Sequence, residues 1–207
     1  MQTGYYLCSG DVTTFVVWSM SIRTRILDAA VELLGTQGLK ALTHIRVDVE
    51  AGVPRGSTSN YFRTRAALLT GVVEWLAELD LADLVSRPSP PADVGAFVAL
   101  LAHAVETATT ASRTRTLARY VLFLEGTHNE DVRRPLLAGR AYFRSFVETT
   151  MERLGAHDPA AAATAITAVG EGMIIQRVTV DPGADVFAPI DAVVRAFVPC
   201  GHTRASD

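Results

Sequence analysis

Apolar residues recur at the spacing of an amphipathic helix along most of the chain, and no stretch keeps the alternation of a β-strand. The first helical pattern covers residues 23–36, and Gly38 follows it, as a glycine often follows the end of a helix. Similar patterns recur toward the C-terminal end. We therefore predict an all-α protein with about nine helices, of which the first three form a small head ahead of a larger helical domain.

Two short helices are predicted directly after the first one. Thr43 is a suitable N-cap for a helix over residues 44–51, and the Gly-Val-Pro sequence at residues 52–54 ends it. A third helix follows over residues 55–61. Two short helices that are joined by a tight turn and follow a longer supporting helix predict a helix-turn-helix. The second short helix of this motif enters the major groove of DNA.

The starts of the later helices carry capping signals. Thr127 and Glu130 have the spacing of a capping box, and Asp158 followed by Pro159 is an N-cap before a proline at the first helical position. The proline cluster at residues 88–91 ends the helix before it. We predict further helices over residues 64–86, 93–111 and 114–126, one that opens at 127–130, and two more over 158–178 and 184–198.

The patterns divide the chain into a helix-turn-helix domain at residues 21–69 and a larger helical domain at residues 70–200. Residues 1–20 show no helical pattern, and we expect them to be a disordered extension or to precede the true translation start. Their apolar run at residues 15–18 is too short for a membrane span or a signal peptide. Residues 201–207 are expected to be a flexible tail, and the protein is expected to be cytoplasmic and to make no membrane contact.

The formal net charge of −3 is unevenly distributed along the chain. Residues 23–69 hold seven Lys and Arg against four Asp and Glu, whereas residues 70–207 hold twelve against seventeen. A basic head on an acidic body favours a DNA-facing N-terminal segment, although a surplus of this size also arises by chance.

No pattern of catalytic or metal-binding residues is present in the sequence. The five histidines have no acidic or cysteine neighbours at metal or triad spacing, and GxSxG and glycine-rich phosphate-binding motifs are missing. Cys8 and Cys200 lie near opposite ends of the chain, which is typical of a reducing compartment. We predict that the protein is not an enzyme and uses no metal and no cofactor.

Hydroxyl and amide side chains gather on the predicted third helix, where they can contact phosphates or base edges. The segments RILDAAVELLGTQGLKALT, EAGVPRGSTSNYF and RTRAALL occur in this order between residues 23 and 69. Together they resemble the N-terminal domain of the tetracycline-repressor (TetR) family. The resemblance implies phosphate contacts for Thr43, Tyr61 and Arg65. The full set of candidate DNA-binding residues is Thr43, Arg55, Ser57, Thr58, Ser59, Asn60, Tyr61 and Arg65.

The resemblance also implies a homodimer whose two heads sit in successive major grooves of a palindromic operator in double-stranded DNA. The larger domain, at residues 70–200, would supply the dimer contacts and bind a small-molecule effector. Effector binding would release the DNA, as expected of a repressor. The alternative is a helical ligand-binding or adaptor protein with a head that does not bind DNA.

Two residues depart from the usual pattern of the family. A small residue is common at position 48, where the second helix crosses the third, but the chain has Asp48. A buried carboxylate is costly without a partner, so Asp48 is expected either to face outward or to cap nearby backbone amides. This residue is the one feature that favours the alternative function. Arg65 stands where a lysine is common and keeps the positive charge.

An effector site in a helical domain is usually an apolar cavity with a few polar groups. A single residue of suitable type belongs more often to the core or to an interface than to such a site. Arg140 and Arg144 are expected to be solvated, as are His103 and Glu106. The candidates for the ligand pocket are Trp75, Phe97, Leu101, Tyr120, Phe123, Tyr142, Phe146, Met173 and Gln176.

The last two long helices resemble those that form the dimer interface of the family. Small residues between 161 and 172 permit a close approach of two helices. A monomer that buries the same helix within itself is the alternative. The apolar contacts with the partner are expected from Ile166, Val169, Met173 and Ile174.

Overall fold

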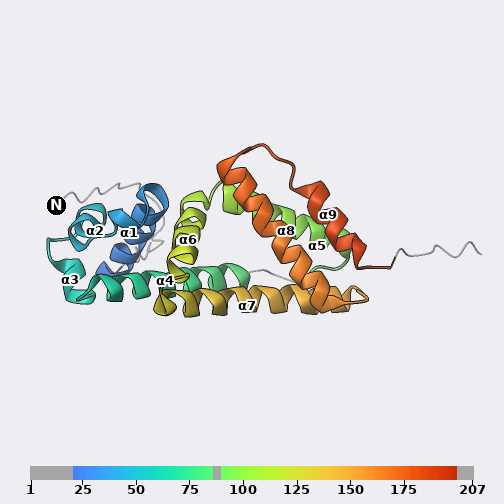
Figure 1. Ribbon diagram of the computed structural model, residues 1–207, viewed down its shortest axis with the longest axis horizontal. Helices are drawn as coiled ribbons and strands as arrows, with labels where there is room; N and C mark the ends of the chain where they lie inside the picture. Colours follow the sequence, from blue (N-terminus) through green and yellow to red (C-terminus); the bar gives the residue numbers. More distant parts are fainter. Residues whose placement is uncertain (1–20, 86–89, 200–207) are drawn as a thin grey trace, which may run out of the picture.

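The computed structural model describes residues 21–85 and 90–199, and every regular element within these ranges is helical. Three helices and a short 3-10 turn form a compact head at one end of the molecule (Figure 1). The prediction of an all-α fold with nine α-helices is confirmed for the described residues. The head contains α1 (Ile22–Gln37), the turn η1 (Leu39–Ala41), α2 (His44–Glu50) and α3 (Ser57–Tyr61). The larger domain contains α4 (Arg65–Val85), α5 (Val94–Thr109), α6 (Arg113–Gly126), α7 (Glu130–Arg153), α8 (Pro159–Thr179) and α9 (Phe187–Ala196).

Some of the expectations fall on parts of the chain that are not described. The proposed extension at residues 1–20, the tail at residues 201–207 and both cysteines lie outside the described residues. Within the described ranges no single helix is long and apolar enough to cross a membrane. By length and composition α5 and α6 pass that test only as a pair, which is bent by 85°.

The head is built on the apolar stripe of α1. Ile26, Leu27, Leu33 and Leu34 are almost completely buried, as the helical spacing of the sequence predicts. They pack in one continuous core with residues of α2, α4 and α6, and this core reaches α7 at Leu136. Burial of a large apolar side chain contributes about 1.5–3 kcal/mol relative to exposure. The head and the adjoining half of the larger domain therefore share one core.

The helix α3 begins later than the sequence pattern predicts. Gly56 adopts a φ of 92°, a left-handed conformation that glycine takes without steric cost. The helix therefore starts at Ser57, and Arg55 lies in the turn ahead of it.

The capping box expected at the start of α7 is wrong. The N-cap is Asn129, whose side chain accepts a hydrogen bond from the backbone amide of Asp131 at 3.2 Å. Thr127 instead donates its hydroxyl to the carbonyl of Leu124 at 2.7 Å. The end of α6 and the start of α7 are only a few residues apart. Thr127 therefore bonds to the last turn of α6, and Asn129 caps α7.

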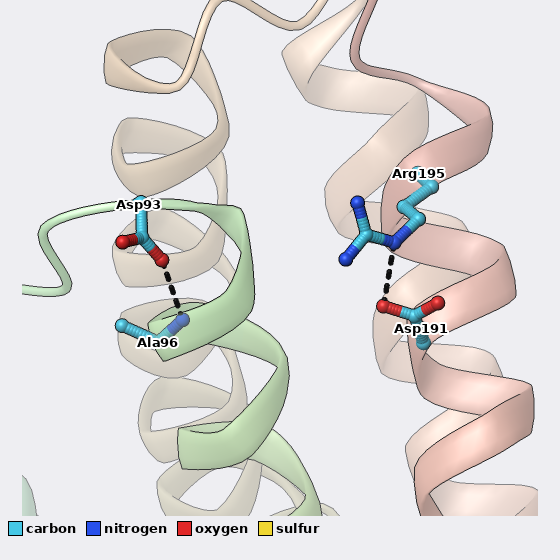
Figure 2. A network of polar contacts seen from close by, with 4 residues as sticks. All are labelled: Asp93, Ala96, Asp191 and Arg195. Atoms are coloured by element: carbon cyan, nitrogen blue, oxygen red, sulfur yellow. Dashed lines mark hydrogen bonds and ion pairs between the residues drawn. The ribbon is translucent and has the colours of Figure 1, made fainter. Parts of the chain in front are cut away.

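A second core lies among α5, α8, α9 and the end of α7, and Phe97 is fully buried in it. Polar contacts position the helices at its surface (Figure 2). Asp93 caps α5 by accepting a hydrogen bond from the amide of Ala96 at 2.8 Å. On the neighbouring α9, Arg195 donates to Asp191 at 2.7 Å, one helical turn away.

Two glycines set the junction between the head and the larger domain. Gly35 of α1 faces the backbone of α6, and a Cβ atom at Gly35 would overlap the carbonyl oxygen of Thr114. Gly71 of α4 is covered by the ring of Phe62 in the same way. A larger residue at Gly35 would force α1 away from α6, whereas a larger residue at Gly71 would displace the Phe62 ring.

Replacing Gly35 by alanine is expected to destabilise the protein, although alanine is the better helix former by about 1 kcal/mol. The added methyl group must separate α1 from α6, and overpacking of this kind costs about 1–3 kcal/mol. Thermal unfolding measures the effect. Gly139→Ala in α7 is the control, because nothing lies within 4 Å of its Cβ position, and it should raise stability. Equal stability of the two variants would contradict the close approach of α1 and α6.

Candidate functional site

The outer surface of the head is formed by α3 and the turn before it. Arg55, Ser59 and Asn60 are exposed, and Tyr61 at the end of the helix is 50% exposed. Thr43 is exposed at the start of α2, where its side chain caps the helix as predicted. Because α2 and α3 lie at one end of the molecule (Figure 1), the exposed polar side chains of both helices are presented there.

Asp48 of α2 is only 3% exposed, and its carboxylate caps the start of α3. One oxygen accepts a hydrogen bond from the Gly56 amide at 2.6 Å. The other accepts from the amide and the hydroxyl of Thr58 at 2.8 and 2.6 Å. Of the two sequence-based expectations, the structure shows the second: the carboxylate caps backbone amides and does not face outward.

These hydrogen bonds keep Asp48 ionised. Burial raises the pKa of the Asp48 carboxyl, but the bonds from Thr58 and Gly56, together with nearby His44, lower it by more, and the pKa lies below its ordinary value. Because Thr58 points toward Asp48, this candidate DNA contact is buried, and the neighbouring Ser57 is half-buried. Charge-assisted hydrogen bonds are stronger than neutral ones, so the rest of α3 is held in a defined orientation.

Two further side chains, from Arg65 and His44, make hydrogen bonds to backbone carbonyls at the ends of other elements of the head. Arg65 at the start of α4 is exposed, but its guanidinium group donates to the carbonyls of Leu39 at 3.0 Å and Leu42 at 3.4 Å. A ring nitrogen of His44 lies 2.6 Å from the Phe62 carbonyl. Both residues therefore contribute to the structure of the head at the edge of its polar surface.

A cavity of about 470 Å³ lies between α4, α6, α7 and α8. Its walls are mainly apolar and include Leu76, Phe123, Leu136 and Phe143. Leu76 and Leu136 also belong to the core that carries the head. A cavity of this size with apolar walls and a few polar groups is typical of a small-molecule site.

Four charged side chains line this cavity and form two ion pairs. Arg119 of α6 pairs with Asp80 of α4, and Arg140 of α7 pairs with Glu171 of α8 at 3.2 Å. The Tyr120 hydroxyl donates to the other oxygen of Glu171 at 2.6 Å. Burial and the adjacent Glu171 carboxylate raise the pKa of Tyr120 well above its ordinary value, so the phenol remains a donor.

A smaller cavity of about 160 Å³ shares Phe143, Thr167 and Glu171 with the larger one. Its other walls are apolar and include Leu101 and Ile190. The buried hydroxyl of Thr167 has no hydrogen-bond partner within the part of the chain that the structure describes. The two cavities therefore meet at Thr167 and Glu171, two polar residues between apolar walls.

Two family models match the chain. Residues 26–72 match the model of bacterial regulatory proteins of the tetR family, and residues 92–199 match the model of the tetracyclin repressor-like C-terminal domain. The second match alone covers more than half of the chain. The protein belongs to the TetR family of transcriptional regulators.

Solved structures share this fold, whereas no curated protein sequence matched the chain. A TetR-family member from Streptomyces coelicolor A3 (SCO1917) is 25% identical with a TM-score of 0.67, over 86% of this chain and 99% of that chain. The multidrug binding protein EbrR complexed with ethidium is 25% identical with a TM-score of 0.65, over 87% and 100%. NalD, the secondary repressor of the MexAB-OprM multidrug efflux pump in Pseudomonas aeruginosa, is 21% identical with a TM-score of 0.63, over 86% and 96%.

Only part of the predicted ligand set lines a cavity in this TetR-family chain. Phe123 and Tyr142 line the larger cavity, and Leu101 lines the smaller one. Trp75 lies at the head instead, where its indole N–H donates to Asp28 of α1 at 2.8 Å. Tyr120 lines neither cavity, but its hydroxyl donates to Glu171 in the wall of both. The other candidates that line neither cavity are Trp75, the exposed Gln176, and Phe97, Phe146 and Met173, which pack in or against the second core.

Sequence patterns do not predict the charged residues of the cavity. The expectation that Arg140 is solvated is wrong, because it pairs with Glu171 and its Cζ atom lies 4.9 Å from the centre of the Phe123 ring. One signal was available in the sequence: Glu171 is the only charged residue between Pro159 and Gln176. A lone carboxylate in an otherwise uncharged helix requires a partner from another helix when it is buried.

The outer face of α8 carries no charge. Both charged residues of this helix are engaged inward: Glu171 pairs with Arg140, and Arg177 donates to Thr109 at 3.0 Å. The exposed positions include Ala161, Thr164, Ala168, Gly172 and Ile175. The four apolar residues of α8 that the sequence assigns to partner contacts lie on the opposite side of the helix. They pack in or against the subunit's own second core, and they are Ile166, Val169, Met173 and Ile174.

Replacing Asp48 by asparagine is expected to lower the free energy of unfolding by about 1–3 kcal/mol at neutral pH. The amide offers one acceptor oxygen in place of two and introduces a buried N–H that faces other donors. Urea unfolding measures the loss. The control is Glu50→Gln, an exposed carboxylate on the same helix, which should leave stability nearly unchanged.

The difference between the wild type and D48N should depend on pH. Because folding lowers the pKa of Asp48, its stabilising effect is fully present above the ordinary carboxyl pKa and is lost as the pH falls through the lower folded value. The two proteins should therefore become more similar in stability in acid. A difference that stays constant from neutral pH to about pH 3 would contradict the assigned role.

Proposed function

We propose that the protein is a transcriptional repressor that binds a palindromic operator in double-stranded DNA as a homodimer and is released by a small-molecule ligand. The observation that carries this proposal is the exposed polar surface of α3, oriented by Asp48 in a chain of the TetR family. A helix anchored on one face and polar on the other suits the major groove. The proposed place of action is the cytoplasm, where the operator lies.

The proposed DNA contacts combine two kinds of recognition. Contacts with base edges give sequence specificity, whereas contacts with phosphates give affinity that decreases with salt. The buried Thr58 is left out of this set, because its hydroxyl is engaged by Asp48. The proposed contacts are Thr43, Arg55, Ser59, Asn60, Tyr61 and Arg65, with the half-buried Ser57 at their edge.

An adaptor whose head does not bind DNA is the less favoured function. The sequence feature that suggested it was Asp48, since an unpaired buried carboxylate would disturb the crossing of α2 and α3. The carboxylate accepts three hydrogen bonds and so supports α3. That feature therefore no longer argues against DNA binding.

The homodimer is proposed to form through α8 and α9. The outer face of α8 is uncharged and rich in small residues, so a second helix can approach it closely. Phe187 of α9 adds an aromatic side chain that is 50% exposed. An uncharged surface of this kind favours burial against the same surface of a second copy. Two heads are also needed to occupy both halves of a palindromic site.

A ligand in the larger cavity is proposed to act on the head through α4 and α6. Leu76 of α4 and Leu136 of α7 line the cavity and belong to the core that carries the head. The helix α6 lines the cavity with Phe123 and meets α1 at Gly35. Because packed cores switch between discrete arrangements, displacement of α4 or α6 changes the separation of the two heads and shifts the population toward a form that does not fit DNA.

Two structurally similar proteins support release by an organic ligand. EbrR is a multidrug binding protein that was crystallised with ethidium, and NalD is a repressor of a multidrug efflux pump. The proposal for this chain rests on its own cavity and uses these proteins as analogy.

The DNA-binding function is tested by a gel-shift assay with DNA from upstream of the protein's own gene. A salt-sensitive shift is expected, and Tyr61→Ala should weaken binding by about tenfold or more, because a groove or phosphate contact is lost. The unfolding temperature should change little, since Tyr61 is half exposed. The control is Arg153→Ala, at an exposed position at the end of α7 and far from the head, and it should bind DNA as the wild type does.

The outcomes of this assay separate the two functions. No shift with the wild-type protein would favour the adaptor. Wild-type affinity in Tyr61→Ala, or loss of folding, would contradict the role assigned to Tyr61.

The dimer is tested by Ala168→Glu, which places a charge on the outer face of α8. The substitution brings two carboxylates into a symmetric interface, so the dissociation constant of the dimer should rise by about tenfold or more. Analytical ultracentrifugation measures it. Ala99→Glu, at an exposed position of α5, is the control and should remain dimeric. An unchanged dimer in Ala168→Glu would place the interface elsewhere.

A further inference from the structure

We propose that the effector is a planar aromatic cation and that the Arg140 side chain lies in the position that this cation takes. The inference rests on the proposed function in one respect, since it assigns a ligand class to the larger cavity. It is argued from the contacts of Arg140. Its Cζ atom lies 4.9 Å from the centre of the Phe123 ring, and its Nη2 atom lies 3.2 Å from an oxygen of Glu171.

The groups around Arg140 form a site for a flat cation. A guanidinium group is planar, delocalised and weakly hydrated, and it stacks on aromatic faces. Phe123 offers the ring face and Glu171 offers the opposite charge. The Tyr120 hydroxyl holds the same carboxylate from its other oxygen. An aromatic cation can satisfy the same groups and adds a larger stacking area.

Arg140, and not Arg119, is the arginine that a ligand can displace. Arg140 has a side chain that is 39% exposed, so it can turn into solvent and regain its hydration. Arg119 is 23% exposed, its Nε atom is enclosed, and it joins α6 to α4 through Asp80.

The charge balance of the cavity favours a cation over other ligands. The groups that face the site are Asp80, Arg119, Arg140 and Glu171, and their charges cancel while Arg140 is in place. When Arg140 turns outward, one negative charge remains at Glu171, which is 31% exposed. A neutral ligand leaves this carboxylate without an opposite charge, and an anion adds repulsion.

The shape of the cavity suits a flat ligand with several fused rings. Phe123, Tyr142 and Phe143 contribute flat aromatic rings to the walls, and Pro135 adds an apolar surface. The volume of about 470 Å³ lies within the range of small-molecule pockets. The smaller apolar cavity beyond Glu171 can accept a substituent of the ring system.

Proflavin, a planar aromatic cation at neutral pH, is the probe, and fluorescence titration of the purified protein measures its affinity. Arg140→Gln removes the competing internal cation and should tighten proflavin binding by about fivefold to tenfold. Glu171→Gln removes the opposite charge and should weaken it by about tenfold or more. Arg144→Gln, at an exposed position one turn along α7, is the control and should bind as the wild type does.

The anion 9-anthracenecarboxylate has a ring system of the same size and separates charge from aromatic contact. It should bind the wild type more weakly than proflavin does, and Arg140→Gln should not strengthen it. The inference is overturned if Arg140→Gln weakens proflavin binding, if the anion binds the wild type more tightly than proflavin, or if proflavin binds neither protein. Tighter binding in Arg140→Gln cannot arise from a loss of folding.

These titrations contain no DNA, so their outcome is independent of the gel-shift assay. Proflavin binding without any DNA shift would overturn the repressor function and leave the ligand class in place. A DNA shift without proflavin binding would overturn the ligand class and leave the repressor function in place.

Discussion

One continuous apolar core holds the helix-turn-helix head and the wall of the larger cavity together. It runs from the stripe of α1 through α4 to α6 and α7, and it includes Leu76 and Leu136, which also line the cavity. Protein interiors are packed as densely as organic crystals, so a side chain that moves on the cavity side must be accommodated by a neighbouring helix. Because of the close approach at Gly35, there is no free space between α1 and α6 at this position. Head and cavity are therefore coupled by packing.

Two carboxylates in apolar surroundings illustrate two ways of compensating a charge. Asp48 is bonded to backbone amides of the next helix and to Thr58, which are rigid and close in sequence. Glu171 is bonded to Tyr120 and Arg140, which are side chains from two other helices. The first arrangement orients α3 through rigid backbone groups, whereas the second depends on one long, partly exposed side chain, which is the one proposed to give way to a ligand cation. This difference suits the proposed function, in which α3 keeps one orientation and the side chains of the larger cavity rearrange around a ligand.

The local features of the fold follow from the sequence because they depend on neighbouring residues. The burial of Ile26 and Leu27 and the cap at Thr43 are set by contacts within a few residues along the chain. The polar surface of α3 is predicted for the same reason. Thr127 shows the limit of this reasoning, since two helix ends compete for the same cap and the spacing alone does not say which one wins.

The sequence by itself determined the helical class, the helix-turn-helix and the polar face of α3, because helical periodicity and turn chemistry act locally. Only the tertiary structure decided that Asp48 caps α3, that Trp75 packs at the head, and that Arg140 lies over Phe123 beside Glu171. These contacts join residues from different helices, and periodicity states which face of a helix is apolar without stating which helix it meets. From the sequence alone, a charged side chain such as Arg140 is predicted to be solvated, because the opposite charge comes from another helix.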